Sequence, residues 1–351
     1  MANIKKLKEN TVKLVKLEDV CYNGSSSLSQ KDIIMLEGKY PVYGASGLIK
    51  YINFYKYDKE YIAIVKDGAG IGRTMILPAN SSVISTLQYI FPKENINIRY
   101  LYYALNAMDL SKYYSGVTIP HIYFKDYKKE ELYLPIIDEQ INIVNKLDKI
   151  REIIDIRKKQ IEELDEIIKS QFIEMFERGQ YPKDEFINIA KEIYAGGDKP
   201  KDISKVQDDE YLYPVFANGY ENEGLQGYSK SYRTGDNAVT ISARGTIGYS
   251  FIRNEKFTPI VRLITIIPHE KANIVYLKYA IDNLNIAGSG TSQEQLTVPD
   301  IKKKKITIPP IELQNKFADI VKQIDKQKFE IQNSLEEMQK LQESLMNKYF
   351  G

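Results

Sequence analysis

The sequence predicts an α+β protein: two tandem, pseudo-twofold-related α/β domains separated by two long antiparallel coiled-coil helices. Three observations carry this prediction. The chain repeats itself at a spacing of about 174 residues, each repeat contains alternating apolar runs, and each repeat ends in a long charged segment with heptad periodicity. We therefore expect globular domains at residues 1–135 and 181–310, each followed by a spacer helix, at 136–180 and 311–351.

The internal repeat is clearest at four landmarks that share one register. The first copy carries Ser115-Gly116, Asp126, Pro135 and Gln140, and the second carries Ser289-Gly290, Asp300, Pro309 and Gln314. Because all four pairs lie 174 residues apart, the two halves are expected to share one topology.

Each repeat begins with short apolar runs and then contains a helical stretch. Residues 62–65 and 238–241 are apolar runs followed closely by glycine, which is typical of strands joined by tight turns. Residues 99–108 and 275–283 read as helices. The lysine run 302–305 precedes an apolar triplet, and its simplest interpretation is a solvated edge strand, with phosphate contact as the functional alternative.

The segments after Pro135 and Pro309-Pro310 have heptad periodicity. Their seams are Ile143, Leu147, Ile150, Ile154, Ile161, Leu164, Ile168 and Phe172 in the first copy, and Phe317, Val321, Ile324, Ile331, Leu335, Met338, Leu345 and Tyr349 in the second, broken at Arg157, Lys328 and Gln342. Each helix of roughly 35 to 38 residues would be about 55 Å long. Since a single apolar stripe is unstable alone, the two seams should pack together, and a pseudo-twofold makes the pair antiparallel.

Composition restricts the class of protein. A single cysteine, Cys21, excludes an intrachain disulfide, and no Cys/His cluster has the spacing of a zinc site, so no metal is expected. The sequence shows no apolar signal core and no apolar run near the roughly 18 residues that cross a bilayer, so a cytoplasmic protein without membrane contact is expected.

Charge is distributed unevenly along the chain. Residues 1–135 carry 18 Lys and Arg against 13 Asp and Glu, whereas residues 136–180 carry 8 against 11. Residues 181–310 are close to balanced, with 17 against 16. Basic charge in the globular parts is a weak footprint, of the right sign, for a polyanionic ligand.

The glycine-rich segment 67–72 invites a phosphate-loop interpretation, because glycines let backbone N–H groups approach an anion. In the second copy Gly68 and Gly70 are replaced by Arg244 and Thr246, and only the Ile-Gly ending is kept. This favours a structural turn. Arg73 and Arg244 are nevertheless placed to contact DNA phosphates there.

Catalytic signatures are missing from the sequence. No G-x-x-x-x-G-K-[ST], G-x-S-x-G, H-E-x-x-H or Asn-Pro sequence occurs, and Pro299-Asp300 lacks the Glu-x-Lys of a common nuclease pattern. The two histidines, His121 and His269, do not occupy equivalent positions in the repeat. We therefore predict no catalytic residue and no cofactor bound by this chain.

The order of globular domain, proline-containing exit, glutamine and long helix, twice over, resembles the specificity subunit of type I restriction-modification systems. The resemblance rests on residues 40–45, 116–122 and 135–140 and on their partners 213–218, 290–296 and 309–314. Two departures are visible: the first exit has one proline where the pattern favours two, and Leu313 stands where the first copy has Glu139.

The resemblance implies a non-catalytic subunit that serves in defence against phage. Each domain would be a target-recognition domain that reads half of a bipartite site in double-stranded DNA, and the paired helices would fix the spacing of the half-sites. Two modification subunits, which carry S-adenosylmethionine and methylate adenine, would dock on the helices, and restriction subunits would join them.

Loops at equivalent places in the two domains are the expected DNA-reading segments, since tyrosine, lysine, asparagine, serine and glutamine can bond to phosphates and base edges. They span residues 46–51, 66–73 and 115–121 in the first half, and 218–232, 242–248 and 289–293 in the second. The candidate DNA-binding residues are Ser46, Lys50, Tyr51, Lys66, Arg73, Ser115, Thr118, His121, Asn218, Tyr220, Lys230, Arg233, Arg244, Ser289, Thr291 and Gln293.

A coiled-coil adaptor that binds only protein partners is the main alternative. Salt-dependent DNA binding by the chain with its partners distinguishes the two, because the release of counterions from DNA requires a steep dependence on salt.

Overall fold

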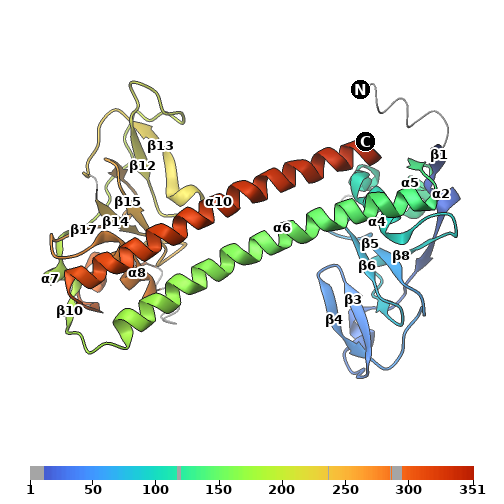
Figure 1. The fold of residues 1–351 in the computed structure, drawn as a ribbon, viewed down its shortest axis with the longest axis horizontal. Helices are drawn as coiled ribbons and strands as arrows, with labels where there is room; N and C mark the ends of the chain where they lie inside the picture. Colours follow the sequence, from blue (N-terminus) through green and yellow to red (C-terminus); the bar gives the residue numbers. More distant parts are fainter. Residues whose placement is uncertain (1–11, 117–119, 236, 285, 287–294) are drawn as a thin grey trace. The chain divides into compact units, whose positions relative to one another are not determined.

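A computed structural model describes residues 12–116, 120–235, 237–284, 286 and 295–351 (Figure 1). The chain divides into two compact units: residues 1–157 with 334–351, and residues 158–333. In the described residues, no helix is long and apolar enough to cross a membrane.

The first unit contains three small sheets. A four-stranded antiparallel sheet has the order β2-β8-β5-β6, a three-stranded sheet has the order β4-β3-β7 with β3 and β7 parallel, and β1 pairs with β9. The strands are β1 (Lys13–Lys16), β2 (Cys21–Ser25), β3 (Tyr40–Gly44), β4 (Gly47–Ile52), β5 (Tyr61–Val65), β6 (Thr74–Leu77), β7 (Ser82–Val83), β8 (Leu87–Pro92) and β9 (Glu131–Leu134). The short helices are α2 (Leu17–Val20), α3 (Gln30–Ile33), α4 (Ile98–Ala107), η1 (Leu110–Tyr113) and α5 (Phe124–Tyr127).

The second unit repeats this topology strand for strand. Its sheets have the orders β11-β17-β14-β15 and β13-β12-β16, again with one parallel pair, and β10 pairs with β18. The strands are β10 (Lys183–Glu185), β11 (Ala190–Ala195), β12 (Tyr213–Phe216), β13 (Leu225–Ser229), β14 (Ala238–Ile241), β15 (Ser250–Arg253), β16 (Thr258–Pro259), β17 (Ile264–Pro268) and β18 (Lys305–Thr307), and the short helices are α7 (Phe186–Ile189), η3 (Glu221–Gly224), α8 (Ile274–Asn283) and α9 (Val298–Lys302). The shared topology expected from the repeat is confirmed.

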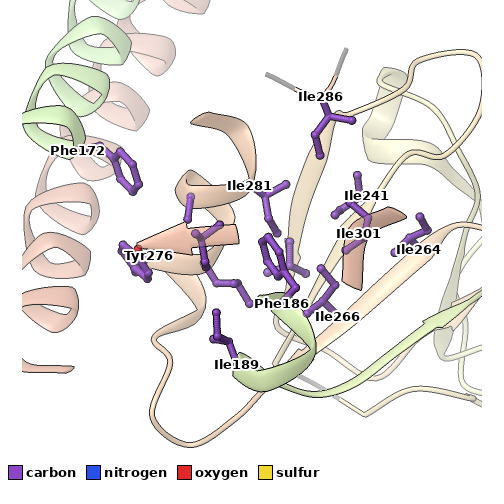
Figure 2. Packing of buried hydrophobic residues seen from close by; sticks show 14 of the residues in the cluster. Phe172, Phe186, Ile189, Ile241, Ile264, Ile266, Tyr276, Ile281, Ile286 and Ile301 are labelled. Carbon is purple, nitrogen blue, oxygen red and sulfur yellow. The ribbon is translucent and has the colours of Figure 1, made fainter. Parts of the chain in front are cut away.

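The two central strands of each four-stranded sheet, β5 and β8 in the first half and β14 and β17 in the second, are buried on both faces, which explains their nearly continuous apolar runs. In β5, Ile62 and Ile64 pack in the cluster that includes α4, whereas Tyr61, Ala63 and Val65 pack in the cluster on the opposite face. Figure 2 shows the matching core of the second unit, where Ile241 and Ile264 of the sheet and Ile281 of α8 belong to one cluster.

The repeated glutamine has one structural role in both halves. Gln140 is fully buried; its side-chain oxygen accepts the N–H of Asn97, which caps α4, and its NH₂ donates to the carbonyl of Pro135 at 2.8 Å. Gln314 accepts from the N–H of Asn273 and donates to Pro309 in the same way. Each glutamine therefore ties the proline exit, the capped helix and the first turn of the long helix together.

Two long helices follow the proline exits. The first, α6 (Ile137–Phe172), continues as a π-helical turn over Ile173–Glu177, and the second, α10, covers Ile311–Phe350. Ile143 and Leu147, near the start of α6, share a cluster with Leu345 and Tyr349 near the end of α10.

In the second unit the opposite ends of the same helices meet, since the Phe172 and Phe317 rings lie 5.6 Å apart. Figure 2 shows Phe172 on its long helix beside the Tyr276 ring, 5.8 Å away. The two helices are packed in antiparallel directions, as the sequence predicts. At the seam break Lys328, the ammonium lies 2.6 Å from Asp165 of α6.

The lysine run 302–305 differs from its predicted edge strand. Lys302 ends α9, and β18 begins only at Lys305. The reason is local: Thr297 accepts the N–H of Asp300 in a capping box and Pro299 occupies the first turn, so a short helix forms ahead of the strand.

Candidate nucleic-acid interface

The glycine-rich segment 67–72 is a structural turn between β5 and β6. Gly72 has φ +84° and its N–H donates to the carbonyl of Val65 at 2.9 Å. In the second half Gly248 has φ +93° and donates to Ser242 at the same distance. The preceding isoleucine packs on the core of its own half in both copies, which explains why the Ile-Gly ending is kept.

Three segments of the first half meet around this turn. Asp67 Oδ1 lies 2.7 Å from His121 Nδ1, and the N–H of Gly68 donates to the carbonyl of Pro120 at 3.0 Å. Arg73 donates to the carbonyl of Ala45 at 3.4 Å, beside Ser46. The structure therefore brings together the 45–46 turn, residues 66–73, and Ser115 with residues 120–121, where Ser115 and His121 exchange two backbone hydrogen bonds of 2.8 Å.

The expected loop at residues 46–51 is a strand instead. Gly44 pairs with Gly47, so Ala45 and Ser46 form a two-residue hairpin turn and β4 begins directly after it. Lys50 donates to the carbonyl of Ile34 at 2.9 Å, and Tyr51 is exposed on β4. These two candidates therefore lie next to each other on β4, with their side chains on opposite faces of the strand.

The same junction recurs in the second half with different side chains. Asn218 accepts the N–H of Ala243 and donates to the carbonyl of Val261, each at 2.7 Å. Arg244 directs two N–H groups at the side-chain oxygen of Gln295, at 3.0 and 2.6 Å. Asn218 thus joins two segments of the junction, since its side-chain oxygen and its side-chain NH₂ each already form a hydrogen bond.

Tyr220 is the exposed aromatic of this junction. Its side chain is 59% exposed and its ring lies 4.7 Å from that of Tyr249. The expected loop at residues 218–232 is only partly irregular, because η3 and then β13 occupy residues 221–229.

Two further candidates in the second half already have partners. Lys230 is paired with Glu210 and lies 3.2 Å from Asp202, and hydrogen bonds to these carboxylates raise its pKa. Arg233 donates to the carbonyl of Asp198 at 3.1 Å. Lys230 therefore has its charge largely compensated within the chain.

The remaining candidates, Thr118, Ser289, Thr291 and Gln293, lie outside the described residues. Within the described ranges, no group of three His, Cys, Asp or Glu side chains could hold a metal ion.

Arg253 at the end of β15 was missed by the sequence analysis. Its side chain is 3% exposed, lies 3.6 Å over the Phe216 ring, and donates to Thr240 Oγ1 at 3.0 Å. It also donates to the carboxylate and the carbonyl of Glu223, at 2.8 and 2.7 Å. Burial lowers its pKa to about 10, so the guanidinium stays charged at neutral pH.

The contact with Glu223 supports a strained turn. Asn222 and Glu223 have φ values of +46° and +52°, a left-handed conformation that costs energy outside glycine. Arg253 holds this turn directly after Tyr220. The only signal in the sequence was an arginine at the end of the short apolar run of β15. An arginine in such a place is not by itself a sign of a buried side chain.

Comparison with known proteins gives a consistent result. The model of the type I restriction modification DNA specificity domain matches the chain twice, at residues 9–166 and 188–341. A Mycoplasma pneumoniae protein provisionally named a type I specificity subunit is 28% identical over 329 residues, covering 88% of this chain and 87% of its own. The specificity subunit of the type I restriction enzyme MjaIX from Methanocaldococcus jannaschii is 24% identical over 303 residues, 74% of this chain and 69% of that one.

The fold is also similar to solved structures. A crystal structure of a type I restriction-modification S subunit from M. genitalium has a TM-score of 0.65 at 17% identity, covering 98% of both chains. A chain from a structural study of the complex assembly and conformational transition of the type I system has a TM-score of 0.60 at 15% identity, covering 97% of this chain and 98% of that one.

Proposed function

Because the chain belongs to the family of type I restriction modification DNA specificity domains, we propose that each of its halves reads one part of a bipartite site in double-stranded DNA. A specificity subunit is the non-catalytic component of a type I complex, in which it recognises the DNA target and takes part in assembly. In our proposal residues 1–135 and 181–310 are the two target-recognition domains, and residues 136–180 and 311–351 are the spacers.

The observation that carries this proposal is the three-segment junction found at the same place in both halves. In one half it is closed by Asp67, His121 and Arg73, and in the other by Asn218 and Arg244. Two domains that recognise different half-sites need the same backbone arrangement with different side chains, because base edges are distinguished by the donors and acceptors presented to them. We propose that the candidate residues beside these junctions contact DNA.

The long helices are proposed to carry the partners. Both present exposed apolar side chains, among them Ile156 on α6 and Phe329 on α10, which are 48% and 66% exposed. Contacts of this kind suit two modification subunits, which bring S-adenosylmethionine, and restriction subunits that join them. We place this assembly in the cytoplasm, where its DNA substrate lies.

Sequencing the methylated bases of a host with and without this gene tests the function. A bipartite methylated motif that disappears with the gene is expected. Arg73→Ala and Arg244→Ala should each weaken DNA binding by about 1–3 kcal/mol if the side chain contacts a base, or lower the salt dependence by roughly one unit if it contacts a phosphate.

Lys183→Ala, which removes an exposed charge on β10, serves as the control and should change neither quantity. Salt-independent DNA binding by the assembled parent would instead favour the adaptor that binds only proteins.

A further inference from the structure

The first half contains a groove lined by lysines. It has a volume of about 570 Å³ and is lined by Lys66, Lys93, Lys125 and Lys128, which come from three separate parts of the chain. Two exposed tyrosines, Tyr22 and Tyr123, also line it; Glu18 is the one carboxylate among its described lining residues. The groove is therefore strongly basic.

The lysines are held in place rather than free to sweep the surface. Glu18 accepts Lys128 Nζ on its carboxylate at 2.6 Å and Lys93 Nζ on its backbone carbonyl at 2.8 Å. Lys125 Nζ lies 5.3 Å from the centre of the Tyr123 ring. Glu18 thus orders two ammonium groups, one through its carboxylate and one through its backbone carbonyl, and its carboxylate neutralises only one charge.

The groove is continuous with the junction described above. Lys66 directly precedes Asp67, which is bonded to His121, and the Tyr123 ring stacks on the His121 ring at 6.4 Å. A ligand strand that leaves the junction past His121 would pass over Tyr123 and meet the lysines next.

The floor of the groove argues against a reactive site. Buried Gln88 donates to the hydroxyl of buried Tyr127, which gives a polar floor. Cys21 also lines the groove, but its thiol is 1% exposed and burial raises its pKa to about 12, so it stays protonated and unreactive. The groove therefore suits binding rather than chemistry.

The second half does not repeat the lysines of this groove, although its topology is the same. The equivalences follow from matching hydrogen bonds: Lys93 N–H donates to Val20 as His269 N–H donates to Ile189, and the carbonyl of Lys66 accepts from Ile122 as that of Ala243 accepts from Leu296.

In each of the following pairs, the first residue belongs to the groove or its floor in the first half, and the second residue is its counterpart in the second half. The pairs are Lys66 and Ala243, Lys93 and His269, Lys125 and Pro299, Lys128 and Lys302, Glu18 and Ile187, Gln88 and Ile264, and Tyr127 and Ile301. Only one of the four lysines is kept. The fold does not require the basic groove, which points to a ligand of the first half.

We propose that this groove holds the sugar-phosphate backbone of the DNA that flanks the first half-site. Lys66 is paired with Asp67 at 3.7 Å and Lys128 with Glu18 at 2.6 Å, whereas Lys93 and Lys125 have no ion pair within the described residues. Two uncompensated ammonium groups beside two paired ones fit a polyanion, and lysine contacts phosphate as a point charge without reading sequence. This inference rests on the proposed function and adds to it an asymmetry: the first domain contributes more of the salt-dependent affinity than the second.

The test uses the complete chain assembled with its modification subunits. A Lys93→Gln and Lys125→Gln double variant should lower the slope of log affinity against log salt by about two units and leave the methylated motif unchanged. A matched double variant in the second half, Lys302→Gln with Lys303→Gln, should lower the slope by less. Lys93→Arg with Lys125→Arg keeps the charges and should keep the parent slope, which separates lost charge from a lost fold.

Three results would overturn the proposal. An unchanged slope in the glutamine variant would show that the groove does not touch phosphate, an altered first half-site would show that it reads bases, and loss of a partner subunit would make it a protein-docking surface. A parent complex that neither binds DNA in a salt-dependent way nor directs methylation would refute the proposed function itself, independently of the groove.

Discussion

The two halves have the same strands, but different kinds of side chain pack under their four-stranded sheets: aromatic rings in the first half and a buried arginine in the second. Tyr61 of β5 pairs with Leu77 of β6, and at the same place in the second half Ala238 of β14 pairs with Arg253 of β15. An aromatic residue and an aliphatic one are thus exchanged for a small residue and a buried arginine. The comparison separates what the fold requires from what each domain is free to change.

The first half uses an aromatic cluster. Tyr89 lies 4.7 Å from Tyr61 and 4.6 Å from Tyr57, ring centre to ring centre, and its hydroxyl accepts the N–H of Val83. Burial raises the pKa of Tyr89 to about 12 and also raises that of Tyr61, so both stay neutral. Such a cluster supports the β3-β4 hairpin mainly by the packing of rings, with neutral hydrogen bonds at the hydroxyls of Tyr61 and Tyr89.

The second half uses a charge. Thr240 and Thr265 occupy the positions of Ala63 and Tyr89, and the Arg253 side chain fills the space that they leave. Because Arg253 also bonds to Glu223, the core of this half is coupled directly to the turn that follows Tyr220. Equal topology therefore gives one rigidly packed platform and one that is linked by hydrogen bonds to a candidate DNA contact.

The largest expected effect is on the aromatic cluster. Tyr89→Ala should destabilise the first half by about 4 kcal/mol, because it removes a fully buried ring and leaves a cavity. Its counterpart Thr265→Val should cost less than about 0.5 kcal/mol or stabilise, since the buried Thr265 hydroxyl has no hydrogen-bond partner among the described residues.

Hydrogen exchange at the amides of β5 and β14 reports the stability of each half separately. If the two variants lost the same free energy of unfolding, the aromatic cluster of the first half and the threonines of the second half would contribute equally to stability, contrary to the comparison.

The next effect concerns Arg253. Arg253→Met should destabilise the second half by about 2 kcal/mol and release the left-handed turn at Asn222 and Glu223, because buried hydrogen bonds to a charged group are lost. Faster exchange of the amides of β13 and weaker DNA binding are expected together.

Glu223→Gln is the matched control. Its carboxylate is 58% exposed and the carbonyl contact with Arg253 remains, so the loss should be clearly smaller. If both variants behave alike, the guanidinium acts only through the carboxylate and its packing under the sheet contributes nothing.

Local and periodic signals explain what the sequence predicted. The common spacing at Pro135 and Gln140 predicted a shared topology, and the heptads predicted that two long helices follow the proline exits. Pairing between distant residues was not predictable: Arg253 meets Glu223, which lies 30 residues away along the chain, and the groove lysines are separated by up to 62 residues. Periodicity shows which positions point inward but not which polar side chain is satisfied there.

A smaller and equal effect is expected where the halves agree. Gln140→Leu and Gln314→Leu should each cost about 2 kcal/mol, since each removes the side-chain partner of a partly buried backbone N–H and of a buried carbonyl. Chemical unfolding of both variants measures this. A large difference between them would show that the proline exits are not equivalent despite identical bonding.

The smallest effect on stability, and the most informative for function, is expected from lengthening both helices. Seven residues inserted after Arg157 and seven after Asn333, where each helix passes from one unit to the other, preserve the heptad phase. Stability should change by less than about 1 kcal/mol, as neither half loses a core contact.

Each inserted helix grows by roughly 10 Å, which equals about three base pairs at 3.4 Å. The methylated motif should gain a longer gap between its half-sites. Both half-sites should be kept, because the sheets and the three-segment junctions of the two halves are untouched. Four-residue insertions at the same points break the heptad phase and should abolish activity, which controls for mere tolerance of added length. An active seven-residue variant with the parent gap would show that the helices do not measure DNA, and would favour the adaptor whose helices only dock partners.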